Sequence, residues 1–95
     1  MITHIVLLKL QNRDQESIEK MKEVILSMKG KIECLRDLTV AADFFHAKIS
    51  YDVAMIAQFD SKEDLNMYLA HPAHIEVGKY IENIQAKVVA VDYEI

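Results

Sequence analysis

The feature that most limits the possible folds is a set of short segments that are apolar on both faces of a β-strand. Residues 2–10 form a run rich in Ile, Val and Leu, which is typical of a strand. Successive side chains of a strand point to opposite sides of the sheet, and here both sides are largely apolar. Residues 86–95 share this property, and residues 51–59 share it in part. Such strands need cover on both faces, because apolar surface in water is unfavourable.

The first helix is predicted over residues 13–29, because apolar side chains recur there at spacings of three and four and would form one buried stripe. Asn12 is the expected N-cap, with Gln15 at the capping-box position three residues later. Gly30 can adopt the left-handed conformation that ends such a helix. The stripe consists of Ile18, Met21, Ile25 and Met28.

Two more strands and a helical region are expected in the rest of the chain. Residues 35–43 predict a weak strand, and residues 51–59 predict a clearer one. Ser61 is a good N-cap for the helix that follows. Pro72 is expected to end that helix and to start the next, which runs to about Ile84.

The resulting order, β-α-β-β-α-β, predicts a ferredoxin-like α+β sandwich: a four-stranded antiparallel sheet with helices on one face. Residues 1–95 are expected to form a single domain. Helices on one face leave the second apolar face uncovered, and an apolar surface of that size usually marks an interface. We therefore expect a homodimer that packs sheet against sheet, with the helices outside, as a dimeric α+β barrel.

Charge and cysteine content exclude several classes of protein. Lys and Arg number 11 against 15 Asp and Glu, a net charge of −4, which argues against binding to nucleic acid or to an anionic membrane surface. Cys34 is the only cysteine, so no intramolecular disulfide can form and a reducing compartment fits best. The apolar run at residues 2–10 is too short to span a membrane and has no basic leader. A cytoplasmic location is expected.

The stretch from Tyr68 to His74 contains two histidines around Pro72 and is the most unusual in the chain. Histidine can both give and take a proton near neutral pH, and a phenol can polarise a carbonyl group. His4 lies within an apolar strand face and can reach the same region. We predict a pocket between helices and sheet, suited to acid–base work. Its catalytic candidates are His74, Tyr68 and His4, and its ligand-binding candidates are His71, Val77 and Ile81.

Plainer roles stay open for these residues. Each histidine can be a loop or core imidazole that is hydrogen-bonded to a carbonyl group. No metal is expected, since no third ligand accompanies the histidine pair. No phosphate-binding glycine loop is present, since the two glycines stand alone. No cofactor is expected. Cys34 and His46 would form a nucleophilic pair only if the fold joined them. Asp92 and Glu94 are interpreted as charges at the rim of the last strand.

Five segments in a fixed order carry a resemblance to a known family. They are Thr-His-Ile-Val-Leu-Leu-Lys-Leu around His4, Ser50-Tyr51-Asp52-Val53, Phe59-Asp60-Ser61-Lys62-Glu63-Asp64-Leu65, Tyr68 with His71-Pro72-Ala73-His74, and Val91-Asp92-Tyr93. With these the chain resembles, over nearly its whole length, the stress-responsive α/β-barrel (Dabb) family. The resemblance implies a ferredoxin-like fold and a sheet-to-sheet homodimer.

The resemblance also bears on chemistry. One plant member of the family is a polyketide cyclase that works by an aldol reaction without metal or organic cofactor. Its catalytic histidine corresponds to His74, its supporting tyrosine to Tyr68, and its opening-strand histidine to His4. Three hypotheses follow: a protein that binds a small apolar or carbonyl-containing ligand, a cofactor-independent cyclase-like acid–base enzyme, and a non-catalytic structural or stress-protective dimer.

Overall fold

One antiparallel sheet organises the molecule. The computed structural model describes all residues from Met1 to Ile95. The strands lie in the order β2-β3-β1-β4, so β1 is central and pairs with both β3 and β4. Their bounds are β1 Ile2–Lys9, β2 Asp37–Ala42, β3 Val53–Phe59 and β4 Lys87–Glu94.

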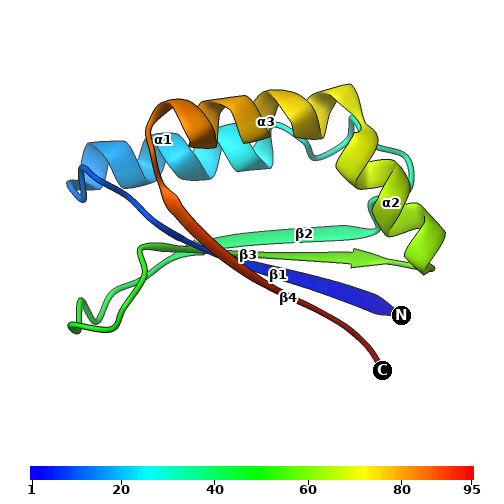
Figure 1. Cartoon of the computed structure of the whole chain (residues 1–95), viewed down its shortest axis with the longest axis horizontal. Helices are drawn as coiled ribbons and strands as arrows, with labels where there is room; N and C mark the ends of the chain where they lie inside the picture. The colour runs from blue at the N-terminus through cyan, green and yellow to red at the C-terminus, as the bar shows by residue number, and fades with distance from the viewer.

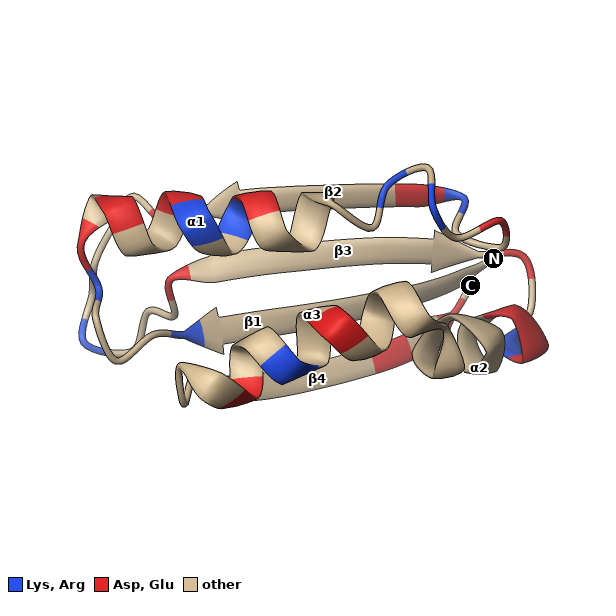
Figure 2. Ribbon diagram, turned by 90° about the horizontal axis from the view of Figure 1, so that it is seen from above, with Lys and Arg blue, Asp and Glu red and all other residues tan.

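Three helices cover the same face of this sheet (Figure 1). Seen from above, α1 lies over β2 and β3, whereas α3 lies over β1 and β4 (Figure 2). Their bounds are α1 Gln15–Leu26, α2 Lys62–Ala70 and α3 Pro72–Asn83. This arrangement confirms the predicted α+β class and the ferredoxin-like sandwich with helices on one face.

The predicted helix boundaries are only partly correct. Asn12 is not the N-cap of α1: the carboxylate of Asp14 accepts a hydrogen bond from the Ser17 N–H at 2.8 Å and caps the helix instead. The helix ends at Leu26 rather than near residue 29, and turns follow it up to Gly30, which has a φ of 83°. Ser61 caps α2 as expected, and Pro72 is the first residue of α3.

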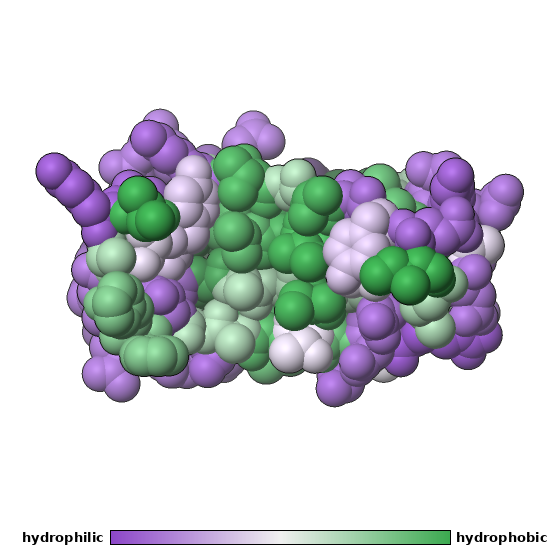
Figure 3. Space-filling model, turned by 90° about the horizontal axis from the view of Figure 1, so that it is seen from below, coloured by the Kyte–Doolittle hydropathy of each residue, from purple (hydrophilic) through white to green (hydrophobic).

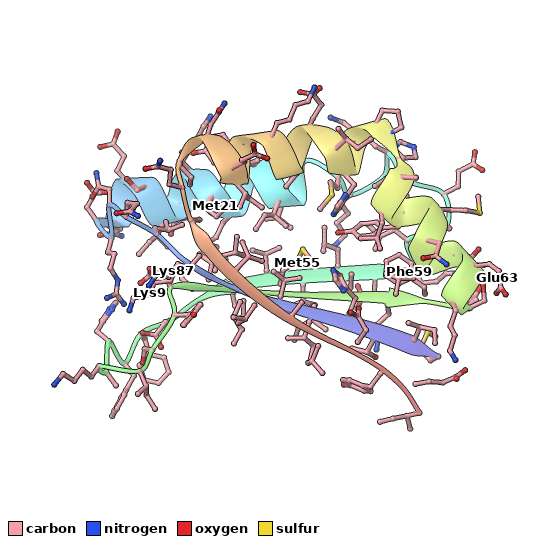
Figure 4. All side chains as sticks on the ribbon, viewed as in Figure 1. Lys9, Met21, Met55, Phe59, Glu63 and Lys87 are labelled. Carbon is pink, nitrogen blue, oxygen red and sulfur yellow. The ribbon has the colours of Figure 1, made fainter.

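The hydrophobic core fills the layer between the sheet and the helices. In Figure 4, Met21 points down from α1 and Met55 points up from β3 into this layer. The even-numbered side chains of β1 face the same layer, because they stand opposite inward residues of β3. Its largest fully buried side chains are Tyr68, Phe59, Leu8, Met21, Ile25 and Met28. None of the three helices has the length and hydropathy needed to cross a membrane.

The opposite face of the sheet is apolar and has no cover within the chain. Figure 3 shows hydrophobic side chains gathered across the middle of this face. They come from β1, β3 and β4 and are partly exposed, although they neighbour one another across the strands. They include Leu7, Ile56, Val89, Val91 and Tyr93.

A buried carboxylate joins the end of β1 to the start of β3. Asp52 is 1% exposed and accepts hydrogen bonds from the Leu10 N–H at 2.8 Å and from Arg13 Nε at 2.9 Å. Its own N–H donates to the Leu8 carbonyl at 2.8 Å. Asp52 therefore satisfies the backbone where the chain leaves the sheet for α1.

We expect Asp52→Ala to lower the free energy of unfolding by about 2–4 kcal/mol, because it leaves a buried N–H and the Arg13 guanidinium without their acceptor. Urea denaturation at one protein concentration measures the change. Asp60→Ala is the matched control: it breaks the exposed Arg36–Asp60 pair of 2.7 Å and should have a much smaller effect. Equal losses in the two variants would contradict this role of Asp52.

Candidate functional site

A cavity of about 280 Å³ lies between α3 and the inner face of β1 and β4. It exists because α3 packs against α1 and α2 rather than closely on β4. Val88 and Ala90 of β4 therefore point toward the helices yet stay exposed. Most of the wall is apolar, and polar groups gather at the end near the start of β1. Such a combination is typical of small-molecule sites.

His4 brings an oriented imidazole to the polar end. It is buried on the inner face of β1, where the register places it directly opposite Asp92 of β4. Its Nδ1 is hydrogen-bonded to Asp92 Oδ1. Because an ionised carboxylate can only accept, this bond places a proton on Nδ1 and fixes the orientation of the ring.

Tyr68 of α2 is completely buried beside the two histidines. Its ring centroid lies 4.6 Å from that of His74, 6.0 Å from that of His4 and 4.9 Å from that of Phe59. Burial raises the pKa of the phenol to about 12, so it stays protonated at neutral pH. Its hydroxyl meets only Met55 Sδ at 3.8 Å, and a thioether is a weak acceptor. The hydroxyl can therefore donate to a ligand oxygen.

His74 stands in the first turn of α3 and faces the cavity. Burial lowers its pKa below the ordinary value of 6.5, the nearby His4 lowers it further, and a hydrogen bond to the backbone of Leu69 opposes both. Its imidazole is therefore neutral at pH 7. A neutral imidazole beside a phenol that keeps its proton can act as a base.

The structure brings together five of the six site residues predicted from the sequence. His4, Tyr68, His74, Val77 and Ile81 all line the cavity. His71 does not line it: its Nδ1 accepts a hydrogen bond from the Ala73 N–H at 3.0 Å, so it is the N-cap of α3.

Asp92 is a charge on the edge strand, as the sequence predicts, and it is also the hydrogen-bond partner of His4, which the sequence does not predict. The sequence does contain a clue, because side chains alternate along a strand and Asp92 lies on the same face of β4 as Val88 and Ala90. This alternation alone does not give the strand register that places Asp92 opposite His4. Asp92 also borders a second, more open hollow of about 440 Å³ near Lys62 and Glu94, so its carboxylate reaches solvent.

The other candidates lie apart from the cavity. The Cys34 thiol donates to the Asp64 carbonyl at 3.2 Å, and burial raises its pKa, which makes it a poor nucleophile. His46 lies in the exposed loop after β2 beside Asp43. The fold therefore does not join the cysteine to this histidine. No group of three or more potential ligand side chains is arranged to hold a metal ion.

Comparisons with known proteins agree on one family and one fold. Residues 2–95 match the Stress responsive A/B Barrel Domain (Dabb) family. The stress-response A/B barrel domain-containing protein DABB1 of Arabidopsis thaliana is 32% identical over 97% of this chain, and the match covers 46% of that protein. The chain thus spans about half the length of this relative.

Two solved structures show the same fold. A dimeric ferredoxin-like protein from Bacteroides fragilis is 27% identical, covers 99% of this chain and 95% of its own, and has a TM-score of 0.83. A dimeric ferredoxin-like protein from Thermobifida fusca is 25% identical, covers 99% of this chain and 90% of its own, and has a TM-score of 0.85. Both are described as proteins of unknown function.

The lowered pKa of His74 leads to a testable pH dependence. The unfolded chain takes up a proton on this histidine at a higher pH than the folded chain does. The free energy of unfolding is therefore at its full value, as far as this histidine is concerned, above pH 6.5. It decreases as the pH falls from 6.5 toward the lower pKa of His74 in the folded chain. We expect His74→Gln to flatten this part of the profile of unfolding free energy between about pH 5 and pH 8.

NMR titration of the His74 ring checks the same point directly. Its midpoint should lie below the ordinary histidine value of 6.5. A midpoint at or above 6.5 would be incompatible with a neutral base in the cavity.

Proposed function

Because the chain belongs to the family of stress-responsive A/B barrel domains, we propose that it binds a small organic molecule in the cavity between α3 and the sheet. The observation that carries this proposal is the convergence of His4, Tyr68 and His74 on one end of an apolar cavity. The Tyr68 hydroxyl has only the weak acceptor Met55 Sδ, and a ligand oxygen would give it a stronger one.

The shape of the cavity suggests the chemical class of the ligand. The polar end holds Tyr68 as a donor and His74 as a neutral imidazole. Farther along, Leu8, Ile81 and Val88 offer only apolar contacts. A carbonyl or enolic oxygen at the polar end, carried on a small apolar body, satisfies both parts. A volume of about 280 Å³ restricts this molecule to a small one.

A second candidate function is acid–base catalysis. It is favoured because His74 is neutral and can take a proton, whereas His4 is held by Asp92. In this reaction, neutral His74 takes a proton from the carbon beside a carbonyl group. The electron pair of the broken C–H bond forms the enolate, and Tyr68 donates a hydrogen bond to its oxygen. His4, which Asp92 orients, has its ring centroid 6.0 Å from that of Tyr68 and adds polarity. The enolate carbon can then attack a second carbonyl carbon, and the electron pair of that C=O π bond becomes an alkoxide that takes the proton back from His74. This aldol closure needs neither metal nor organic cofactor.

We further propose that two copies of the chain pack through the outer faces of their sheets as a dimeric α+β barrel. The uncovered apolar side chains on β1, β3 and β4 support this. The relatives from Bacteroides fragilis and Thermobifida fusca are dimeric, which is consistent with it. The unit would be a single domain of residues 1–95 in the cytoplasm, where a lone cysteine stays reduced. Without turnover, this dimer would serve a structural or stress-protective role.

Ligand binding can be tested with 2-nonanone, which joins a carbonyl group to a straight apolar chain. We expect the ketone to shift the amide resonances of residues around the cavity in a titration of the 15N-labelled protein. Tyr68→Phe should weaken binding by about tenfold, because it removes the hydroxyl that donates to the ketone oxygen. Tyr51→Phe makes the same change away from the cavity and should have no effect.

Exchange of the ketone's α-hydrogens in D₂O tests catalysis separately. If the acid–base proposal holds, the wild-type protein accelerates this exchange, and His74→Gln reduces the acceleration by about 10²-fold. If the protein binds the ketone but does not accelerate exchange, the catalytic proposal fails and ligand binding stands. If it does neither, the structural dimer is favoured.

The dimer can be tested with Ile56→Glu, which places a charge in the middle of the outer sheet face. Ile56 is 37% exposed there, and the control residue Ile75 is 44% exposed on α3. Sedimentation should give a species near 10.9 kDa for Ile56→Glu, whereas wild type and Ile75→Glu sediment as dimers. A wild-type monomer would refute the proposal.

A further inference from the structure

Helix α3 carries a glycine in its middle, on the side that faces the cavity. Gly78 lies between His74, one turn earlier, and Ile81, just under one turn later, and all three line the cavity wall. Glycine within a helix is destabilising relative to alanine, because it loses more backbone freedom on folding. Some other requirement must therefore favour the absence of a side chain here.

The protein itself supplies no such requirement. A Cβ atom built on Gly78 meets no heavy atom within 4 Å, so no close packing excludes alanine. Its φ is not in the positive range, unlike that of Gly30, which is 83°. Neither helix packing nor backbone conformation therefore accounts for the glycine. The space above its Cα is open and belongs to the cavity.

We propose that Gly78 keeps this space free for the ligand and thereby sets the width of molecule that the site accepts. This inference rests on the proposed ligand binding and narrows its ligand class to a ketone that carries an aromatic ring. A straight alkyl chain needs only the length of the cavity, whereas a ring beside the carbonyl needs width next to His74. His74 is partly exposed and lines the cavity, so its ring is an aromatic group that such a ligand can contact.

The test compares acetophenone, which is aromatic, with 2-octanone, which is straight and of similar size, on 15N-labelled protein. Wild type should bind both. Gly78→Leu fills the open space and should weaken acetophenone binding by about tenfold or more, while 2-octanone binding changes less than about threefold. Lys79→Leu adds the same side chain to the exposed side of α3 and should leave both unchanged.

Thermal melting of Gly78→Ala without ligand provides an independent readout. Since the added methyl group meets no protein atom, this variant should melt at a higher temperature than wild type. A lower melting temperature would show that packing requires the glycine, which overturns the inference.

The binding results separate the two proposals. If wild type binds acetophenone at the cavity and Gly78→Leu binds it equally well, the inference fails while ligand binding stands. Binding of 2-octanone alone by wild type also overturns the inference. If wild type binds neither ketone, the proposed function fails first, and the inference fails with it.

Discussion

The register of β1 between its two neighbours is the constraint on which the site depends. Hydrogen bonds on both edges hold this strand, with Ala57 of β3 opposite His4 on one side and Asp92 of β4 on the other. A slip by one residue would turn every side chain of β1 to the other face. It would move Val6 and Leu8 out of the core and carry His4 away from Tyr68. The packing energy of the core therefore also fixes the position of the imidazole.

The break between α2 and α3 is the second element that assembles the site. His71 has extended backbone, and Pro72 starts the new helix in a new direction. Tyr68 precedes the break and His74 follows it, so the change of direction lets the two rings pack against each other. His71 supports this geometry as an N-cap rather than as part of the cavity. Within seven residues, Pro72 starts a helix, His71 caps it, and Tyr68 and His74 line the cavity.

Local patterns predicted most of this architecture, whereas the pairing of distant residues was not accessible to them. Alternation and helical spacing placed four strands and the helices, and the concentration of histidines drew attention to His4, Tyr68 and His74. The role of Asp92 depends on strand register, which the sequence does not state. The N-cap of α1 was misplaced because Asn12 and Asp14 are both good caps, and only the path of the chain shows that Asp14 reaches the Ser17 N–H. The sequence predicts a pocket between helices and sheet, but it does not show that α3 stands away from β4, which is what creates the cavity.

Asp92 belongs to an edge strand, and this has a consequence for dynamics. β4 is paired only with β1, and none of its residues is buried. Edge strands of this kind open more readily than the core, by local unfolding that leaves the rest of the fold intact. Each opening of β4 would separate Asp92 from His4 and leave the imidazole free to rotate. The orientation of His4 is therefore only as persistent as the docking of β4, while Tyr68 and the core beneath it retain the stability of the whole domain.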